Sequence, residues 1–203
     1  MSLSRLACAA GATAALWAAS PALAADDPAA LVEALRGGGH VVFIRHAATD
    51  ADYADQVSAV MGDCSTQRTL SETGWRQAKA IGEAFERLEI PVGEVVSSEY
   101  CRAWQTADLA FGRHEKTADL NFAPAEDYTE EQIAQMRHGL TFHLARAPEA
   151  GANTVLVGHD DVFEAATGIY PEPQGVAFVL RPDGAGGFDV LGYIAPDTLT
   201  TLE

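Results

Sequence analysis

Positive charge is scarce in this chain. Its 203 residues contain 13 lysines and arginines against 29 aspartates and glutamates, a formal net charge of −16 at pH 7. Nucleic acids and anionic membranes are bound mainly through basic surface patches. The charge balance therefore disfavours both as partners, and it draws attention to the few arginines that stand beside apolar segments.

Long apolar runs are also missing, except at the N-terminus. There Arg5 precedes an apolar stretch at residues 6–19, and a small-x-small pattern ends the segment. This three-part pattern predicts a secretory signal peptide over residues 1–24, followed by one domain over residues 25–203. A membrane anchor is the alternative, but the run is short for a span and Pro21 interrupts it. We expect a periplasmic or secreted protein with no stable membrane insertion after signal cleavage.

Cysteine is rare as well. Of the three cysteines, Cys8 lies in the predicted signal peptide, which leaves Cys64 and Cys101. Two cysteines in an exported chain favour one disulfide, with two buried thiols as the alternative. Because Cys101 directly precedes Arg102, a bridge would also hold the segment that carries this arginine.

No internal repeat is visible, and short apolar runs alternate with helical patterns. The alternation predicts a mostly parallel central sheet flanked by helices, with antiparallel strands at its end. The expected fold is α/β, a three-layer sandwich. Strands are expected at residues 40–44, 94–97, 117–122, 153–158, 175–180 and 188–194, and helices at residues 29–36, 71–88, 99–111, 129–147 and 161–168.

Polar side chains follow three of the predicted strands. Arg45 and His46 leave the first, Arg102 follows the second closely, and His159 comes after Gly158 at the end of another. Strand ends in α/β sheets open into a crevice where ligands bind. An arginine fork suits a phosphate, and a neutral imidazole can attack phosphorus. These segments together point to phosphoryl chemistry.

With these segments the chain resembles the histidine phosphatase superfamily, also called phosphoglycerate mutase-like. Its Arg-His-Gly-x-Thr motif corresponds to residues 45–49, with Ala47 in place of the glycine. Its Ser-x-x-x-x-Arg-Ala-x-x-Thr-Ala segment corresponds to residues 97–107, and its Gly-His to residues 158–159. The resemblance covers most of the chain after residue 38 and implies the phosphoglycerate mutase-like fold.

The resemblance also implies roles for individual residues. His46 would be the nucleophile that becomes phosphohistidine. Arg45, Thr49, Arg102 and His159 would bind the phosphoryl oxygens, and the charged and donor groups would stabilise the transition state. This scheme needs no metal or cofactor, and its partner is a small phosphorylated substrate.

The group that protonates the leaving alkoxide stays open at this stage. A carboxylic acid is expected near the pocket. In the mutase-like branch the acid follows the strand after the second arginine, where Glu126 and Asp127 stand. In the acid-phosphatase branch it is the aspartate after the second histidine, here Asp160. Glu126 could instead be a solvated loop charge, and Asp160 could position His159 or cap the following helix.

Two further interpretations concern neighbouring polar residues. A zinc site would use His46, His159, Asp160 and Asp161, but it lacks a compact spacing such as His-Glu-x-x-His and would place two arginines beside a cation. Gln67 and Arg68, just before the helix predicted at residues 71–88, could contact substrate, although a surface position is the favoured alternative.

The sequence therefore predicts an exported phosphomonoester hydrolase that acts through phosphohistidine. Two alternatives are kept: a phosphate-ester binding protein with little or no turnover, and a phosphomutase. Sugar phosphates, phosphorylated envelope components and phosphoproteins are all candidate substrates.

Overall fold

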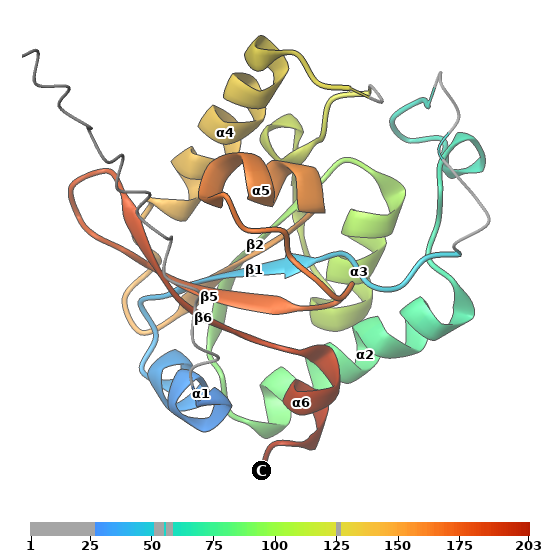
Figure 1. Cartoon of the computed structure of the whole chain (residues 1–203). Helices are drawn as coiled ribbons and strands as arrows, with labels where there is room; N and C mark the ends of the chain where they lie inside the picture. Colours follow the sequence, from blue (N-terminus) through green and yellow to red (C-terminus); the bar gives the residue numbers. More distant parts are fainter. Residues whose placement is uncertain (1–26, 51–54, 56–58, 125–126) are drawn as a thin grey trace, which may run out of the picture.

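A six-stranded sheet forms the centre of the molecule (Figure 1). The computed structural model describes residues 27–50, 55, 59–124 and 127–203, so the predicted signal peptide lies outside the described residues. The strand order is β3-β2-β4-β1-β5-β6; β5 runs antiparallel to its neighbours β1 and β6, and the other pairs are parallel. The mostly parallel sheet is thereby confirmed. The strands are β1 (Val41–Arg45), β2 (Val92–Ser98), β3 (Glu115–Thr117), β4 (Asn153–Gly158), β5 (Ala177–Pro182) and β6 (Phe188–Ile194).

Helices cover both faces of this sheet, which confirms the three-layer architecture (Figure 1). One apolar core joins one face to α1 (Pro28–Arg36), α2 (Glu72–Arg87), α3 (Cys101–Phe111) and α6 (Pro196–Thr201). The other core lies beneath α4 (Glu130–Leu144) and α5 (Asp160–Thr167). In β1, Val42 and Ile44 belong to the first core and Val41 and Phe43 to the second. Burial on both faces explains why this strand is apolar without alternation.

Helix starts follow the local sequence closely. Asp27 caps α1 and accepts a hydrogen bond from the backbone of Ala29, and Thr129 forms the capping box expected at the start of α4. The strand predicted at residues 117–122 is wrong in its bounds, because the strand here, β3, covers Glu115–Thr117. The Thr117 side chain accepts from the Asp119 backbone, which turns the chain into a 3-10 helix, η2 (Ala118–Leu120). Helix α6 was not expected.

The topology brings the carboxyl ends of three strands to one edge of the sheet. β1 and β2 both pair in parallel with β4, with Arg45 opposite Gly158 and Ser97 opposite Val157. At the other end of β4, the Asn153 amide donates to the carbonyls of Leu35 and Pro91. The polar segments that follow β1, β2 and β4 therefore meet at the carboxyl-terminal edge of these strands, because the three strands are parallel neighbours.

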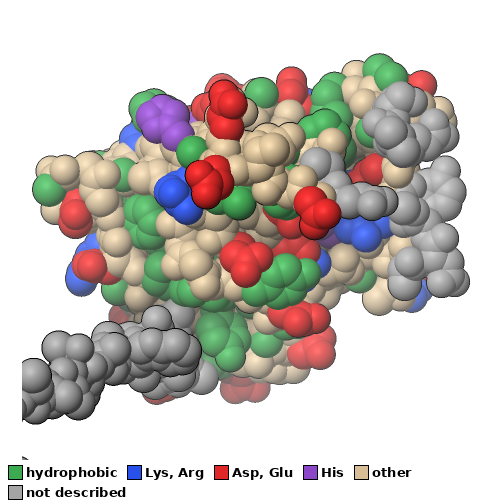
Figure 2. Space-filling view, turned by 45° about the horizontal axis from the view of Figure 1, so that its top comes forward, with side chains coloured by type: hydrophobic (Ala, Val, Ile, Leu, Met, Phe, Trp, Pro, Cys, Tyr) green, Lys and Arg blue, Asp and Glu red, His purple; other side chains and the backbone are tan. Residues whose placement is uncertain are grey.

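The surface reflects the acidic composition. Figure 2 shows acidic side chains distributed over the visible face, with few basic ones among them. Within the described part of the chain, no helix is long and apolar enough to cross a membrane.

Candidate active site

His46 is fully buried directly after β1, and its ring has a defined tautomer. Nδ1 lies 2.9 Å from the Ala47 carbonyl oxygen, which can only accept, so Nδ1 carries the proton. Nε2 is left with its lone pair, which accepts from Nε of Arg102 at 3.2 Å. Burial first, and then the Arg102 guanidinium, lower the pKa of His46 to about 3. The imidazole is therefore neutral at ordinary pH, the state in which Nε2 is a nucleophile.

The loop after His46 is held by groups from two helices. Thr106 of α3 accepts from the Ala47 backbone, and Gln77 of α2 accepts from the Ala48 backbone. Helix α2 begins unusually close to this loop: a Cβ on Gly74 would lie 1.9 Å from the Ala48 carbonyl oxygen. A glycine is therefore required there for the helix to pack against the loop that carries the histidine.

Arg102 lies at the start of α3 with a side chain that is almost fully buried. Its Nη1 donates to Asp55 at 2.9 Å, while its Nε faces His46. The guanidinium also lies over the rings of Tyr100 and Phe122, with distances of 5.2 and 5.1 Å to their centroids. Arg102 thus places one cation in contact with the candidate nucleophile and one carboxylate.

Arg45 and Asp160 form a second ion pair at the site. The other Nη of Arg45 donates to the Pro171 carbonyl, and the Tyr170 hydroxyl donates to the same Asp160 oxygen that accepts from Arg45. Burial alone would raise the pKa of Asp160, but Arg45 first, then Tyr170 and smaller contributions, together hold the pKa below its usual value. Asp160 is therefore ionised and held in an ion pair with Arg45.

His159 lies at the other side of the cluster, between β4 and α5. Its ring is buried, with a centroid 5.4 Å from that of His46, and Nε2 lies 2.9 Å from the Ser98 hydroxyl oxygen. Burial, followed by Arg102 and His46, lowers the pKa of His159 well below its ordinary value. This second histidine is neutral too.

The predicted disulfide is present and braces the site from one side. Cys64, at the start of a 3-10 helix η1 (Cys64–Thr66), is bonded to Cys101, and the buried Gln67 amide oxygen accepts from the Cys101 backbone. Arg68 follows at once: its backbone N–H donates to Asp55 and its carbonyl accepts from Arg102. This segment is therefore tied directly to the start of α3.

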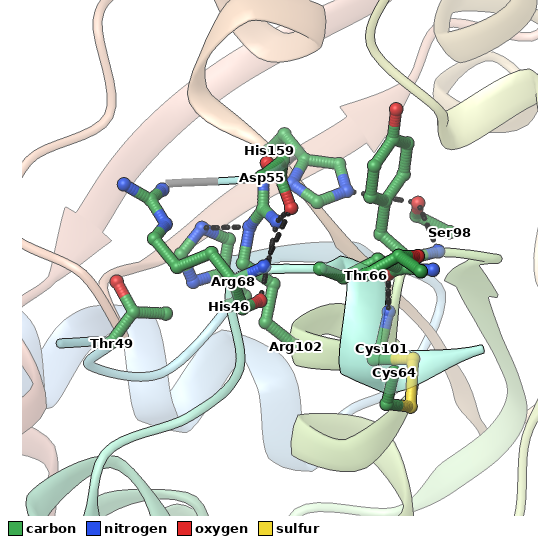
Figure 3. Close-up of polar contacts among 12 residues, drawn as sticks. His46, Thr49, Asp55, Cys64, Thr66, Arg68, Ser98, Cys101, Arg102 and His159 are labelled. Atoms are coloured by element: carbon green, nitrogen blue, oxygen red, sulfur yellow. Dashed lines mark hydrogen bonds and ion pairs between the residues drawn. A yellow bond between two sulfur atoms is a disulfide. The ribbon is translucent and has the colours of Figure 1, made fainter. Parts of the chain in front are cut away.

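Arg68 points into the cluster rather than to the surface, so the favoured surface position is wrong. Figure 3 shows its side chain alongside His46. Its charge contributes to lowering the pKa of both His46 and His159. With Arg45 and Arg102 it makes three cations around two neutral imidazoles, an arrangement that attracts an anion.

The other predicted site residues lie apart from this cluster or outside the description. Thr49 lies at its edge, where its hydroxyl accepts from the Gln174 amide (Figure 3). Asp127 is exposed. Glu126 lies outside the described residues.

The alternative zinc ligands do not share a centre. Asp160 faces Arg45, His46 faces Arg102, and Asp161 lies beside Tyr128. Across residues 27–203, leaving out the positions that are not described, no group of three His, Cys, Asp or Glu side chains could hold a metal ion.

The sequence matches one protein family. The sequence model of the histidine phosphatase superfamily (branch 1) matches residues 41–152, more than half of the chain. The chain belongs to this family. The match includes Arg45, His46 and Arg102 and ends before His159, which the fold brings to the same place. No curated protein sequence matches the chain significantly.

Solved structures similar to this chain have the phosphoglycerate mutase-like fold. The protein histidine phosphatase SixA complexed with tungstate is 14% identical, with a TM-score of 0.56, 79% of this chain covered and 99% of that one. A mutant phosphoserine phosphatase from Entamoeba histolytica with phosphoserine is 12% identical, with a TM-score of 0.55 and coverages of 80% and 99%. A mycobacterial glucosyl-3-phosphoglycerate phosphatase with VO3 is 18% identical, with a TM-score of 0.53 and coverages of 75% and 97%.

Proposed function

We propose that this chain is an exported, metal-independent phosphomonoester hydrolase that acts through a phosphohistidine on His46. The geometry of His46 carries the proposal. A buried, neutral imidazole with its Nδ1 proton held by the Ala47 carbonyl has one nitrogen, Nε2, free of a proton and turned toward an arginine. Membership of the histidine phosphatase superfamily supports a phosphatase.

The reaction follows from this geometry in two displacements. Nε2 of His46 attacks phosphorus, the ester P–O bond breaks, and the leaving alkoxide takes a proton. Water then attacks the phosphorus of the phosphohistidine, the P–N bond breaks, and phosphate leaves. Phosphoryl transfer depends mainly on positioning and on positive charge around the equatorial oxygens. Arg45, Arg68 and Arg102 supply that charge, and Arg102 must turn its Nε from His46 to the phosphoryl group.

The source of the leaving-group proton favours a second candidate function. Asp160, the acid expected after the second histidine, is held as an anion by Arg45 and Tyr170. An ionised carboxylate has no proton to give. A phosphate-ester binding protein with little turnover would keep the same arginines and lack an efficient acid.

Two substrates distinguish these functions. An aryl phosphate has a good leaving group that needs little protonation, whereas an alkyl phosphate needs an acid. A hydrolase with an efficient acid turns over both, and one with a weak acid turns over the aryl ester only. Turnover of neither, with inorganic phosphate still bound in calorimetry, would establish the binding protein and refute the hydrolase.

The nucleophile is tested by trapping. Acid-quenched, radiolabelled wild type should hold acid-labile phosphate, and His46→Ala should lose both the label and the turnover. His138→Ala replaces an exposed histidine of α4 and serves as the matched control. Normal turnover by folded His46→Ala would refute the assignment.

Export is supported by the N-terminal sequence pattern and by the disulfide, which suits an oxidising compartment. Cell fractionation and the mass of the mature protein test it. A cytoplasmic protein that retains residues 1–24 would refute it.

A further inference from the structure

A chain of hydrogen bonds ends on His159 and begins at Glu99. The Asn121 amide nitrogen donates to the Glu99 carboxylate at 2.8 Å, and its amide oxygen accepts from the Glu99 backbone at 3.0 Å. A carboxylate can only accept and a backbone N–H can only donate, so the two contacts fix which end of the amide is oxygen. Asn121 therefore presents its oxygen, not its nitrogen, to the next member.

That next member is Ser98. Its hydroxyl oxygen lies 2.7 Å from the Asn121 amide oxygen, which cannot donate. Ser98 therefore donates its single hydroxyl proton to Asn121, and its oxygen acts as an acceptor in its other contacts. It accepts from the Tyr100 backbone at 3.2 Å and meets Nε2 of His159 at 2.9 Å. Nε2 must then be the donor, so the proton of neutral His159 sits on Nε2.

The other ring nitrogen is left without a proton. Nδ1 of His159 is buried and has no hydrogen-bond partner among the residues that the structure describes. Figure 3 shows the ring with Nε2 toward Ser98 and its opposite edge toward Arg102 and Asp55. The two histidines thus have opposite tautomers, with the proton on Nδ1 in His46 and on Nε2 in His159.

We propose that Glu99, Asn121 and Ser98 are positioning residues that keep the proton of His159 on Nε2, so that Nδ1 faces the phosphate site as an acceptor and selects the monoprotonated phosphoryl group. The phosphate ligand rests on the proposed function. A monoanion donates its P–O–H to Nδ1, whereas a dianion presents only lone pairs to it. No covalent bond changes in this binding step.

The charges around His159 keep this nitrogen an acceptor. Arg45 and His46 face it from the end of β1, Arg102 and Tyr100 from the start of α3, and Arg68 from the segment that follows Cys64. The arginines and burial oppose a second proton on the ring and lower its pKa. Two nearby carboxylates are engaged elsewhere, Asp55 by Arg102 and Asp160 by Arg45, and Asp161 lies beside Tyr128.

The first test reads the tautomer directly and needs no activity. Long-range ¹H–¹⁵N spectra of histidine-labelled mature protein at neutral pH should show His159 with its proton on Nε2 and His46 with its proton on Nδ1. His159→Gln and His46→Gln assign the two signals. A wild-type His159 with its proton on Nδ1 overturns the proposal, even if the protein is an active phosphatase.

The second test is the pH profile of inorganic phosphate binding by calorimetry. Above the second pKa of the probe, the wild-type Kd should rise tenfold per pH unit, because only the monoanion fits. In Ser98→Ala and Asn121→Ala the proton of His159 is no longer held on Nε2, so Nδ1 can donate to the dianion and the slope should flatten. Ser98→Thr keeps the hydroxyl and should keep the wild-type slope. A flat wild-type slope, or an unchanged slope in folded Asn121→Ala, overturns the proposal.

A matched control separates positioning from stability. Asn153→Ala removes a buried, hydrogen-bonded asparagine from the opposite end of β4. It should lower the melting temperature and leave the slope unchanged. Failure of the proposed hydrolase looks different, because neither phosphate ester would then be turned over while the tautomers and the pH slope of phosphate binding stayed as assigned.

Discussion

The two buried histidines should make the protein sensitive to mild acid. An unfolded histidine titrates near 6.5, whereas burial and Arg102 lower the pKa of folded His46 to about 3 and that of His159 in the same direction. Between the folded and unfolded pKa values only the unfolded chain binds the proton, so the free energy of unfolding falls as pH falls. At pH 5, roughly 1.5 units below the unfolded value, His46 costs about 2 kcal/mol relative to pH 8, and His159 adds a loss of the same sign.

This figure does not depend on the folded pKa, provided that it lies well below 5. Urea unfolding at pH 8 and pH 5 measures the loss. The wild type should lose stability at pH 5, and His46→Asn should lose about 2 kcal/mol less than the wild type. Contributions of other histidines cancel in that comparison, and His138→Asn, at an exposed position, should match the wild type. A His46→Asn variant as acid-sensitive as the wild type would refute the argument that His46 is buried neutral.

Three other predictions concern the cluster. Arg102→Ala should lower kcat/KM, with a loss of about 3 kcal/mol or more of transition-state stabilisation. Arg113→Ala, on the surface, should leave the rate per folded molecule unchanged. Turnover should survive exhaustive chelation, and loss with recovery on added zinc would contradict the proposed charge stabilisers. Reduction of the Cys64–Cys101 bond should lower stability by roughly 3–4 kcal/mol. Reduction should also weaken phosphate binding under conditions where the protein is still folded. Unchanged phosphate affinity would mean that the disulfide contributes to stability only.

Local signals in the sequence were enough to predict the fold and to place four polar residues at one edge of the sheet. Continuous apolar runs marked β1 and β4 because both strands are buried on two faces, and caps marked the starts of α1, α2 and α4. Since parallel strands end at a common edge, Arg45, His46 and His159 had to lie close together. Arg102 follows because α3 begins shortly after β2.

Arg68, Asp55 and Asn121 could not be placed in the same way. Arg68 and Asp55 lie in a polar stretch with no helical or strand period, so no local pattern says where they point. Their positions depend on the disulfide, on Gln67 and on the bond from the Arg68 backbone to Asp55, which are tertiary contacts. Asn121 falls where a strand was expected, and its role depends on the turn that replaced it.

Asp160 shows why protonation state is harder to predict than position. Its place directly after His159, at the start of α5, brings its carboxylate to the site, and the sequence allows it to be an acid, a cap or a partner of an arginine. The groups that decide are Arg45, 115 residues away, and Tyr170, 10 residues away. Burial is the largest single influence and raises the pKa, but Arg45, Tyr170 and smaller contributions together outweigh it, so the carboxylate is held as an anion. A neighbour in sequence brings a side chain to the site, but the partners that the fold supplies determine whether it can give up a proton.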